Sequence, residues 1–523
     1  MTHPSSTTSP TDEPSPLPHH RITRRFARLS RPKKIAISLA VGVALITTSI
    51  ITNAFLTNPF GPFPTVRTPY RARFEGDKIV VRDHSDKIHV CDNAACRGDG
   101  FAKSGLYMID SRYFNSPRSK SKTVEGITKD IHSLRFDPEN PYIISGDHFT
   151  PFYNRSLGIF YYSALDASIK TDDNDWRNRE LSYLQTLAFA LSVYDKSEEL
   201  STTIVPMGGS TFTPINVYAY PSDTMYSLLY AGAVLTGVEK AYSPITAPPA
   251  YTLHTKVAAS ALLTKYNASI KRHLAEYRSK VYDESTGLVR SDMHLSGTKD
   301  ITKRENAFYD NVIYWRTLQL AEKLGLTTLD KTFLDDYKQR IIKTFWLADK
   351  GYFLEDRSAE SVAGNYYSSD WLIILSTRFL DPANESERHY FTQSIDYIEK
   401  HGIARPFGVK YQNDRRKSRQ FAPLRIFGTS SYGGDSIWSF WGLEYIKTLL
   451  VLYQDTGDAT YLTEADRNIA AYKQGMVQNG GFPELYDAQG KLYQTPVYRS
   501  VRQTGWVIGF EQALSARQTL TRP

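Results

Sequence analysis

The chain has 523 residues and a formal net charge of +8, nearly all of which comes from the Arg and Lys side chains of residues 19–34, a run without an acid. The rest of the chain is close to neutral, which argues against a nucleic-acid-binding function. Hydrophobic residues make up 41% and aromatic residues 13%, enough for a large core. An aromatic content this high fits a helical core and fits a carbohydrate-stacking cleft equally well.

The N-terminal segments predict a membrane anchor. Residues 35–56 contain no charged side chain, and at ~1.5 Å per residue they span about the ~30 Å hydrocarbon core of a bilayer. No convincing small-x-small cleavage site follows, which favours a transmembrane helix over a cleaved signal peptide. The basic, disordered tail at 1–34 is then cytoplasmic, and the chain beyond a linker at 57–70 is extracytoplasmic. We therefore expect a single-pass protein of the cell membrane, with the lipid bilayer as a partner.

Residues 71–149 predict a small β-rich region. The runs at 78–82 and 87–90 are rich in β-branched residues and are joined by a turn-rich segment. Residues 105–114 are a further candidate strand. We expect a small sheet that precedes a larger domain.

The cysteines and the common ligand motifs predict a disulfide and no metal or cofactor. Cys91 and Cys96 lie close together in a loop-like stretch, and an outward-facing domain favours a local disulfide between them. Two thiols without a nearby His pair make a poor zinc site, and neither a His-Glu-x-x-His motif nor an Asp-x-Asp calcium loop occurs. The sequence also lacks glycine-rich nucleotide loops and a Gly-x-Ser-x-Gly elbow, which argues against nucleotide use and serine hydrolase chemistry.

Residues 150–523 predict one large helical domain. Apolar residues recur at helical spacing in the segments 156–169, 176–194, 222–239, 252–280, 306–324, 330–345, 366–380, 386–400, 436–455, 460–476 and 501–517. Long loops with Gly, Asp, Tyr and Trp separate many of them. The pattern predicts an α/α toroid, in which six helical hairpins close into a ring and the loops at one end line a central cleft. A stacked α-solenoid has as many helices, but these segments show no fixed-period repeat.

Five short motifs occur one after another along the chain, and their order is part of the signal. They are Gly-Leu-Tyr-Met-Ile-Asp-Ser-Arg-Tyr-Phe at 105–114, a helix start at 304–314, Gly-Asp-Ser-Ile-Trp at 434–438, Gly-Phe-Pro-Glu-Leu-Tyr-Asp at 481–487 and Gln-Thr-Gly-Trp at 503–506. Together they resemble six-hairpin glycosidases, especially the glycogen-debranching-enzyme and α-glucosidase-like group. The resemblance implies a mainly α fold, a six-hairpin α/α toroid preceded by a small β region and an N-terminal transmembrane helix.

Two features depart from the pattern of that family. The N-terminal β region is too short to form a full β-sandwich. The loop that carries the family's acid appears here as residues 289–300, Val-Arg-Ser-Asp-Met-His-Leu-Ser-Gly-Thr-Lys-Asp, which is not a clean match.

The resemblance implies cleavage of a glycosidic bond by two carboxyl groups. One protonates the leaving oxygen and the other activates water, and in an inverting enzyme the two lie ~6.5–9.5 Å apart. The 481–487 motif resembles the family's loop that holds the general base, so the resemblance implies this role for Glu484. A loop carboxylate among aromatic residues, which can raise its pKa, is also a suitable place for a working acid or base. Asp292 is the first choice for the general acid and Asp300 the second. The simpler alternatives are a solvated Glu in a turn and an Asp that caps a helix.

Further residues are candidates for binding substrate. Asp435 and Asp370 either cap the helices that follow them or contact sugar hydroxyls. One of the two tryptophans on the 436–455 segment is expected to pack in the core and the other to stack on a sugar. Arg304 either starts a helix together with Glu305 or lies in the cleft. The full set of candidate binding residues is Asp435, Trp438, Trp441, Asp370, Trp371, Tyr153, Arg155 and Arg304.

The function predicted from these motifs is that of a membrane-anchored glycoside hydrolase. It would cleave α-linked glucose-type oligosaccharides with inversion, use no cofactor and bind no nucleic acid. A polysaccharide lyase on the same fold is one alternative, but it would need a Tyr/His or Asn/His pair in place of two carboxylates. A surface glycan-binding protein that kept the toroid and lost the acid is the other, because the acid loop matches poorly.

Overall fold

The computed structural model divides the chain into two units, Met1–Pro62 and Phe63–Pro523. The described residues all lie in the second unit. They are 118–136, 164–201, 222–293, 304–414, 431–495 and 498–520, three strands between 72 and 91, and the short pieces 142–143, 145, 152–158, 203–208, 211–215, 220, 295, 299, 302 and 419. The predicted membrane anchor at 35–56 lies outside them. Within the described part, no helix is both long and apolar enough to cross a membrane.

The β region contains a three-stranded antiparallel sheet of β1 (Ala72–Glu75), β2 (Lys78–Arg82) and β3 (Ile88–Cys91). Strands β2 and β3 coincide with the two predicted β-branched runs. The candidate strand at 105–114 lies outside the described residues. Cys91 ends β3 and pairs in register with Ile79. Cys96 is not among the described residues, so the disulfide stays a prediction.

One set of helices is buried on nearly every side. All residues of α5 (Ser222–Leu235) are buried. Helix α4 (Asp173–Tyr194) exposes little more than its first turn, and α8 (Phe308–Lys323) and α14 (Ser439–Thr456) expose little more than their last turns. Their sequences lack a continuous polar stripe, so they need neighbours all round. Helix α5 packs against α8, and α14 packs against α16 (Val507–Leu520).

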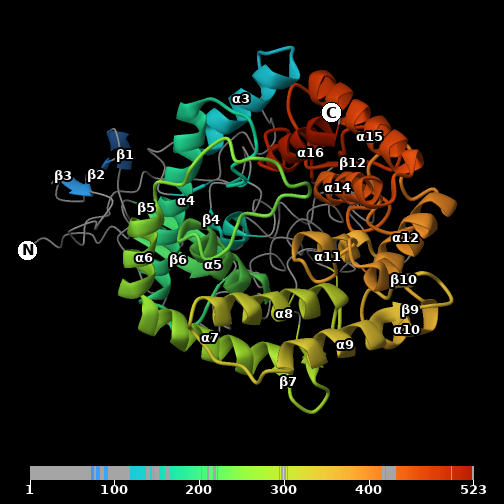
Figure 1. Ribbon diagram of the computed structural model, residues 1–523, viewed down its shortest axis with the longest axis horizontal. Coiled ribbons are helices and arrows are strands. Elements are labelled where there is room, and N and C mark those ends of the chain that lie inside the picture. Colours follow the sequence, from blue (N-terminus) through green and yellow to red (C-terminus); the bar gives the residue numbers. More distant parts are fainter. Residues whose placement is uncertain are drawn as a thin grey trace, which may run out of the picture. The chain divides into compact units, whose positions relative to one another are not determined.

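A second set of helices is amphipathic and covers the first. It comprises α3 (Val124–Arg135), α6 (Lys256–Lys265), α7 (Asn267–Val281), α9 (Phe333–Phe345), α12 (Glu385–Lys400) and α15 (Ala459–Asn479). Each buries one stripe; in α9 the stripe is Tyr337, Ile341, Ile342 and Phe345. Helix α9 packs on α8 and α15 packs on α14. Figure 1 shows α7, α9, α12 and α15 outside α8, α11 and α14, so the helices form two layers.

Local sequence explains where these helices start and stop. The Asp172 carboxylate caps α4 by accepting from the Asp175 amide at 2.8 Å, and Asp458 caps α15 by accepting from the Thr460 amide at 2.9 Å. Gly457 and Gly480 follow α14 and α15 in the left-handed region, with φ of 71° and 60°. The Gly480 cap releases the chain into the loop that carries Glu484.

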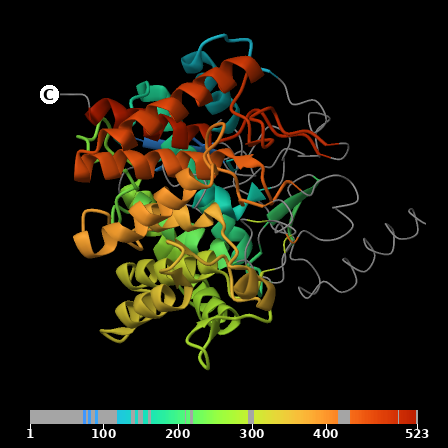
Figure 2. The same cartoon turned by 90° about the vertical axis from the view of Figure 1, so that its right-hand side faces the viewer.

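Short antiparallel hairpins connect the outer helices to the inner ones. These hairpins are β7 (Tyr282–Asp283) with β8 (Leu288–Val289) and β9 (Trp346–Leu347) with β10 (Tyr352–Phe353). A further antiparallel pair, β11 (Ile437–Trp438) with β12 (Leu485–Tyr486), is not a hairpin, because α14 and α15 lie between its strands in the chain. After β8 and β12 the chain runs on to the N-termini of α8 and of α16. After β10 it first forms the short helix α10 (Ala359–Gly364) and then the 3-10 turn η3 (Ser369–Leu372), which leads into α11 (Ile373–Ser376). In Figure 2, seen at 90° to Figure 1, the orange-red helices α14 to α16 lie above the yellow helices α8 and α9.

The last helix closes onto the first ones. Glu511 of α16 accepts hydrogen bonds at 2.8 Å from the His132 Nε2 of α3 and at 3.0 Å from the Arg179 Nη2 of α4. Gln512 donates to Asp166, just before α4, at 3.1 Å. We call His132, Arg179 and Glu511 the seam. A contact of this kind between the first and last helices is what a closed ring of helices requires.

The structure differs from the predicted elements in several places, one of which is the predicted helix at 366–380, where only η3 and the four-residue α11 form. Helix α3 lies in the region expected to be β-rich, where Ile127 and Ile131 give it a short apolar stripe. The predicted helix at 252–280 is broken at Tyr266 into α6 and α7. The described residues of the predicted helix at 156–169 form turns, because the Asp166 carboxylate accepts from the Ser168 amide at 3.0 Å and competes with helical bonding.

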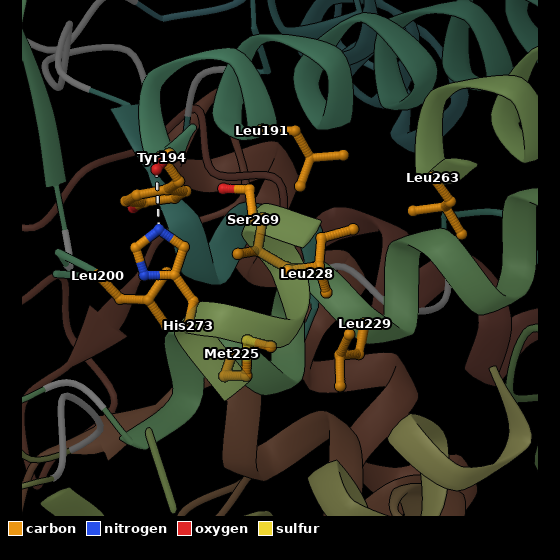
Figure 3. A pocket seen from close by; sticks show the side chains of 10 residues that line it. Leu191, Tyr194, Leu200, Met225, Leu228, Leu229, Leu263, Ser269 and His273 are labelled. Carbon is orange, nitrogen blue, oxygen red and sulfur yellow. Dashed lines mark hydrogen bonds between the residues drawn. The ribbon is translucent and has the colours of Figure 1, made fainter. Parts of the chain in front are cut away.

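The core between α4, α5, α6 and α7 contains a small apolar cavity, which Figure 3 shows at close range. Its volume is about 10 Å³, room for about one water-sized sphere. Leucine and methionine side chains line it, and the His273 ring closes one side by a 2.8 Å hydrogen bond to the Tyr194 carbonyl. The cavity is a packing defect rather than a ligand site, because it is too small for more than a water.

Candidate functional site

Glu484 lies on the loop between α15 and α16, and its backbone is fixed on both sides. Its carbonyl accepts from the Ser439 amide at the start of α14 at 3.0 Å, and its amide donates to the Val501 carbonyl at 2.9 Å. The Ser439 hydroxyl also donates to the Pro483 carbonyl at 2.7 Å. The Glu484 side chain is half-buried, and one of its oxygens accepts a hydrogen bond from the Tyr498 hydroxyl. The carboxylate is therefore held in a defined place at the N-terminus of α14.

Four aromatic rings lead from Glu484 into the interior, and we call them the aromatic wall. The ring of Tyr498 lies 5.4 Å from that of Tyr432, and Tyr432 lies 4.8 Å from Trp438. Trp438 in turn lies 6.0 Å from Tyr411. The Trp438 indole donates to the Tyr432 carbonyl at 2.7 Å, which fixes its orientation. The wall thus joins Glu484 to the segment that contains Tyr411.

The other two candidate tryptophans pack in the core. Trp441 is 1% exposed and lies edge-on to Tyr309 and Tyr411, at 6.4 Å and 6.2 Å. Trp371 is equally buried, and its indole donates to the Tyr367 hydroxyl at 3.1 Å. Trp438 remains the tryptophan nearest to Glu484 through the aromatic wall. Trp438 is buried as well, at 5% exposed, so both tryptophans of α14 and its N-cap pack in the core, and stacking of one of them on a sugar stays a prediction.

Beyond Tyr411 lies a buried ionic cluster centred on Glu355, which follows β10. The Lys299 ammonium contacts one Glu355 oxygen at 2.5 Å, and Arg419 Nη2 contacts the other at 2.9 Å. Arg304 lies 4.0 Å from Glu355 and pairs closely with Asp370. Burial by itself would raise the pKa of Glu355, but Lys299, Arg419 and Arg304 outweigh it and lower the pKa. Glu355 is thus a buried carboxylate held charged by its cations.

Lys299 is the cation of this cluster whose charge depends on pH. Burial lowers its pKa to about 8. The positive charges of Arg419 and Arg304 also lower the pKa, whereas the negative charge of Glu355 raises it. Its ammonium also lies 5.1 Å from the centre of the Tyr411 ring. Lys299 therefore connects the Glu355 cluster to the aromatic wall.

A further buried carboxyl group, Asp310, lies in the first turn of α8. The hydroxyl of Ser222, at the start of α5, donates to it at 2.6 Å. Burial raises the pKa of Asp310 to about 7; Arg304 lowers it, and Asp223 and Asp370 raise it. This residue belongs to the 304–314 motif but was not predicted as a site residue. Its environment comes from α5, which no local pattern around 310 reveals.

Of the two residues predicted as the general acid, only Asp292 lies among the described residues. Asp292 is at the surface, with its side chain 63% exposed, and contacts Arg290 at 2.6 Å. That hydrogen bond lowers the pKa of Asp292, so the carboxyl is deprotonated at neutral pH. Asp300 lies outside the described residues, next to the buried Lys299. Nothing in the described contacts brings Asp292 to Glu484, and both assignments stay predictions.

The predicted binding residues Asp370 and Arg304 form a buried pair. Burial raises the pKa of Asp370 and Arg304 lowers it again. Both residues lie in the Glu355 cluster, so Arg304 is an interior cation and not an exposed helix-start residue. Asp370 lies in the first turn of η3, whose N-cap is Ser368. Its carboxylate is therefore used for the ion pair and not for capping.

The remaining predicted binding residues lie around these groups. Asp435 is partly buried and precedes α14, whose N-cap is Trp438, so Asp435 is not the cap. The charge of Arg155, in the 3-10 turn η2 (Asn154–Leu157), acts on the buried Tyr309 phenol. Tyr153 belongs to β4 (Phe152–Tyr153) and pairs with Thr203 of β5 (Thr203–Gly208).

The described residues contain no group of three or more His, Cys, Asp or Glu side chains placed to hold a metal ion. The chemistry of this region is that of carboxylates, tyrosines and buried cations. A half-buried carboxylate with a fixed orientation suits activation of water. A carboxyl group with a pKa near 7 suits proton donation.

Comparison with known proteins finds likeness in structure only. No protein-family profile matches the chain. A search of the curated proteins also finds no match.

The solved structures that resemble this chain are proteins of the six-hairpin glycosidase fold. A rhamnosidase from Klebsiella oxytoca with rhamnose bound is 13% identical, with a TM-score of 0.47, covering 77% of this chain and 66% of that chain. Cellobiose 2-epimerase from Bacillus thermoamylovorans is 12% identical, with a TM-score of 0.45, over 75% and 91%. Glucoamylase from Saccharomycopsis fibuligera is 11% identical, with a TM-score of 0.43, over 79% and 98%. The chemical interpretation of the site is therefore based on contacts within this chain and not on these structures.

Proposed function

We propose that this chain is a glycoside hydrolase that cleaves α-linked glucose-type oligosaccharides with inversion. The observation that carries the proposal is the placement of Glu484, a half-buried carboxylate on a fixed loop beside the aromatic wall. The motif resemblance supplies the substrate class. Aromatic rings next to a carboxylate are a common way to hold a sugar against a catalytic group.

Glu484 acts as the general base in this proposal. Its carboxylate takes a proton from a water molecule, and the oxygen of that water attacks the anomeric carbon. The Tyr498 hydroxyl donates to one carboxylate oxygen and so fixes the direction of the group. The tie between Ser439 and the Glu484 carbonyl keeps the loop in register with α14. Together these contacts hold the base in position.

The proton donor is proposed to come from the segment between β8 and the first turn of α8. Asp292 and Asp300 are the residues that the family's loop implies. Asp310 meets the chemical requirement for a donor, since burial raises its pKa to about 7 and it holds a proton near neutral pH. The charged, exposed carboxylate of Asp292 does not meet it in this arrangement.

The test uses the full chain and a panel of α- and β-linked oligosaccharides, with NMR detection of the anomer first released. We expect an α-linked substrate to release the β anomer, and Glu484→Gln to abolish release. Glu464→Gln is the matched control, because it makes the same change on the outer helix α15, where Glu464 pairs with Arg405 and Arg467. Retained sugar binding without turnover in the wild type would replace the hydrolase by a glycan-binding protein. Turnover that survives Glu484→Gln would overturn the assigned base.

We also propose that residues 35–56 anchor the chain in the cell membrane with the N-terminus in the cytoplasm. The support is the uncharged stretch itself and the basic run that precedes it. Extraction of membranes with alkaline carbonate tests the anchor: the chain should stay in the pellet. Its release into the supernatant would contradict the proposal.

A further inference from the structure

We propose that Glu355 is the positioning residue of this site, a single buried carboxylate that holds two separate segments of the chain in place around it. The inference rests on the proposed function, because the reaction at Glu484 is what the positioning serves. Glu355 itself does not touch the reacting atoms in this proposal. It acts through the cations and the amide that it binds.

The two carboxylate oxygens of Glu355 are divided among different segments. One oxygen takes Lys299 at 2.5 Å, from the segment before α8. The other takes the Gln412 side-chain amide at 2.7 Å and Arg419 Nη2 at 2.9 Å, both from the connection between α12 and α14. Glu355 has no exposed side-chain surface, and Lys299 and Arg419 are 1% and 8% exposed. These contacts are therefore shielded from water and from salt.

The backbone of Glu355 is itself rigidly placed. Its carbonyl accepts from the Phe308 amide at the start of α8 at 3.0 Å, and its amide donates to the Tyr366 carbonyl at 2.8 Å. Next to it, the Arg357 amide donates to the Glu305 carbonyl at 2.8 Å. The carboxylate thus projects from a point fixed to the inner helix α8. The segments that bind it take their position from that helix.

The segments held by Glu355 are the ones that build the aromatic wall. The backbone amide of Gln412 donates to the Gly434 carbonyl at 2.8 Å, and the backbone amide of Tyr411 donates to the Ser436 carbonyl at 2.9 Å. These bonds fix the strip that carries Tyr432 and leads into Trp438. On the other side, a Cβ atom built on Gly433 would come within 3.4 Å of the Lys299 side chain, so this strip lies directly on Lys299. Displacement of Lys299 or Gln412 therefore moves the wall against which Glu484 is held.

The charge of Lys299 makes this arrangement sensitive to pH. The groups that face its ammonium are Glu355, Arg304, Arg419 and the Tyr411 ring, with the charge of Asp370 also acting between them. Because its pKa is lowered to about 8, the ammonium loses its proton just above neutral pH. A neutral amine no longer pairs with Glu355. We expect the activity to fall as the pH rises through about 8.

The experiment compares Glu355→Gln with Glu239→Gln in the full chain. Glu239 is the matched control, a buried carboxylate with three cations at the other end of α8. On the α-linked oligosaccharide that the wild type cleaves, we expect Glu355→Gln to lower kcat about 100-fold, the size expected when a distant change misplaces a reacting group by about 1 Å. We expect Glu239→Gln to leave kcat and KM of the folded enzyme unchanged. Equal losses in the two variants would overturn the positioning role.

Lys299→Arg provides a second test that does not depend on removing the carboxylate. Arginine keeps its charge at alkaline pH, so the fall in kcat near pH 8 should move to higher pH while activity at pH 7 persists. Glu239→Gln should keep the wild-type pH profile. An unchanged alkaline limb in Lys299→Arg would overturn the role of Lys299 in the proposal.

Amide hydrogen exchange separates this inference from the proposed function, because it needs no substrate. The amides of Thr302, Tyr411 and Gln412 are bonded within the segments that Glu355 holds. We expect them to exchange faster in Glu355→Gln and at the wild-type rate in Glu239→Gln. If no sugar is turned over, the proposed function fails by itself, and the exchange rates still decide whether Glu355 orders these segments. Wild-type exchange in Glu355→Gln would overturn that ordering.

Discussion

Two buried carboxylates, Glu355 and Glu239, lie near opposite ends of α8 and are built from the same parts. Glu355 contacts the start of α8 and binds Lys299 and Arg419, with Arg304 close by. Glu239 follows α5 and binds Arg316 and Lys323 of α8 at 3.1 and 2.7 Å, and Arg378 after α11 at 2.7 Å. A helix of this length separates the two by roughly 24 Å. Each carboxylate thus gathers several cations from different parts of the chain.

The difference lies in where the cations come from and how far water reaches them. At Glu239, two cations belong to α8 itself, and Lys323 and Arg378 are 41% and 45% exposed. At Glu355, Lys299 and Arg419 come from long connections and are 1% and 8% exposed. The first arrangement joins helices that already pack together. The second joins two long connections to the segment at the start of α8, which is why we assign it a role in positioning.

We expect the largest difference between the Glu355 and Glu239 clusters in the unfolding free energy that is lost when one lysine is removed from each. Lys299→Met leaves Glu355 and its neighbours short of a buried cation, and breaking a buried pair in this way costs about 3–5 kcal/mol of unfolding free energy. Lys323→Met removes a half-exposed partner, which costs less than about 1 kcal/mol. Urea unfolding followed by circular dichroism measures both. Similar costs for the two variants would contradict the contrast in burial.

The seam is a third buried carboxylate cluster, and it sharpens the comparison because one of its partners is a histidine. Burial and the charge of Arg179 lower the pKa of His132, whereas Glu511 raises it less. Burial raises the pKa of Glu511, but Arg179 and His132 outweigh it and lower the pKa to about 2. Both shifts tie the stability of the seam to pH.

The two shifts act in separate pH windows. His132 has a folded pKa below its unfolded value of about 6.5, so the unfolded chain binds the proton first and stability falls as the pH drops below about 6.5. Glu511 has a lowered folded pKa, so the stability it contributes is present above about 4.5 and is lost as the pH falls toward about 2. We expect His132→Gln to remove the upper step and to keep the lower one.

Urea midpoints between pH 7.5 and pH 3 measure both steps. His401→Gln is the control, because His401 lies at the exposed end of α12 and bonds only to its own helix. It should leave the pH dependence unchanged. An upper step that persists in His132→Gln would show that another group produces it.

The helices were predictable because their signal is local. In α9 and α12 the apolar residues repeat at helical spacing, and Asp172, Asn384 and Asp458 mark the starts as caps. The loop of Glu484 was predictable for the same reason, since Gly480 ends α15 in the left-handed region. Patterns of this kind need only a few neighbouring residues.

The Glu355 cluster was not predictable, because its members are far apart in the sequence. Lys299, Glu355 and Arg419 are separated by more than fifty residues at each step, and nothing near any of them indicates a partner. Asp310 shows the same limit: its raised pKa depends on burial and on Ser222 and Asp223 of another helix. Arg304 was predicted either to start a helix together with Glu305 or to lie in the cleft, because only its neighbours in sequence could be considered. Its actual partner, Asp370, lies 66 residues further on.

The smallest expected effect concerns Asp292, whose contact with Arg290 is the exposed counterpart of the buried clusters. Its side chain is 63% exposed, so Asp292→Asn should leave the urea midpoint unchanged, and any loss of turnover would be chemical in origin. A fluoride leaving group needs little protonation, so loss of the proton donor spares hydrolysis of α-glucosyl fluoride while it abolishes cleavage of an oligosaccharide.

We expect this signature for Asp310→Asn and not for Asp292→Asn. The reason is that a donor must hold its proton, and only the buried carboxyl has a raised pKa. Circular dichroism of Asp310→Asn confirms that the variant is folded before its kinetics are compared. The signature in Asp292→Asn would restore the first choice made from the family's loop. It would also mean that Asp292 exchanges Arg290 for a buried environment when a sugar binds, since its present pairing keeps the carboxyl charged.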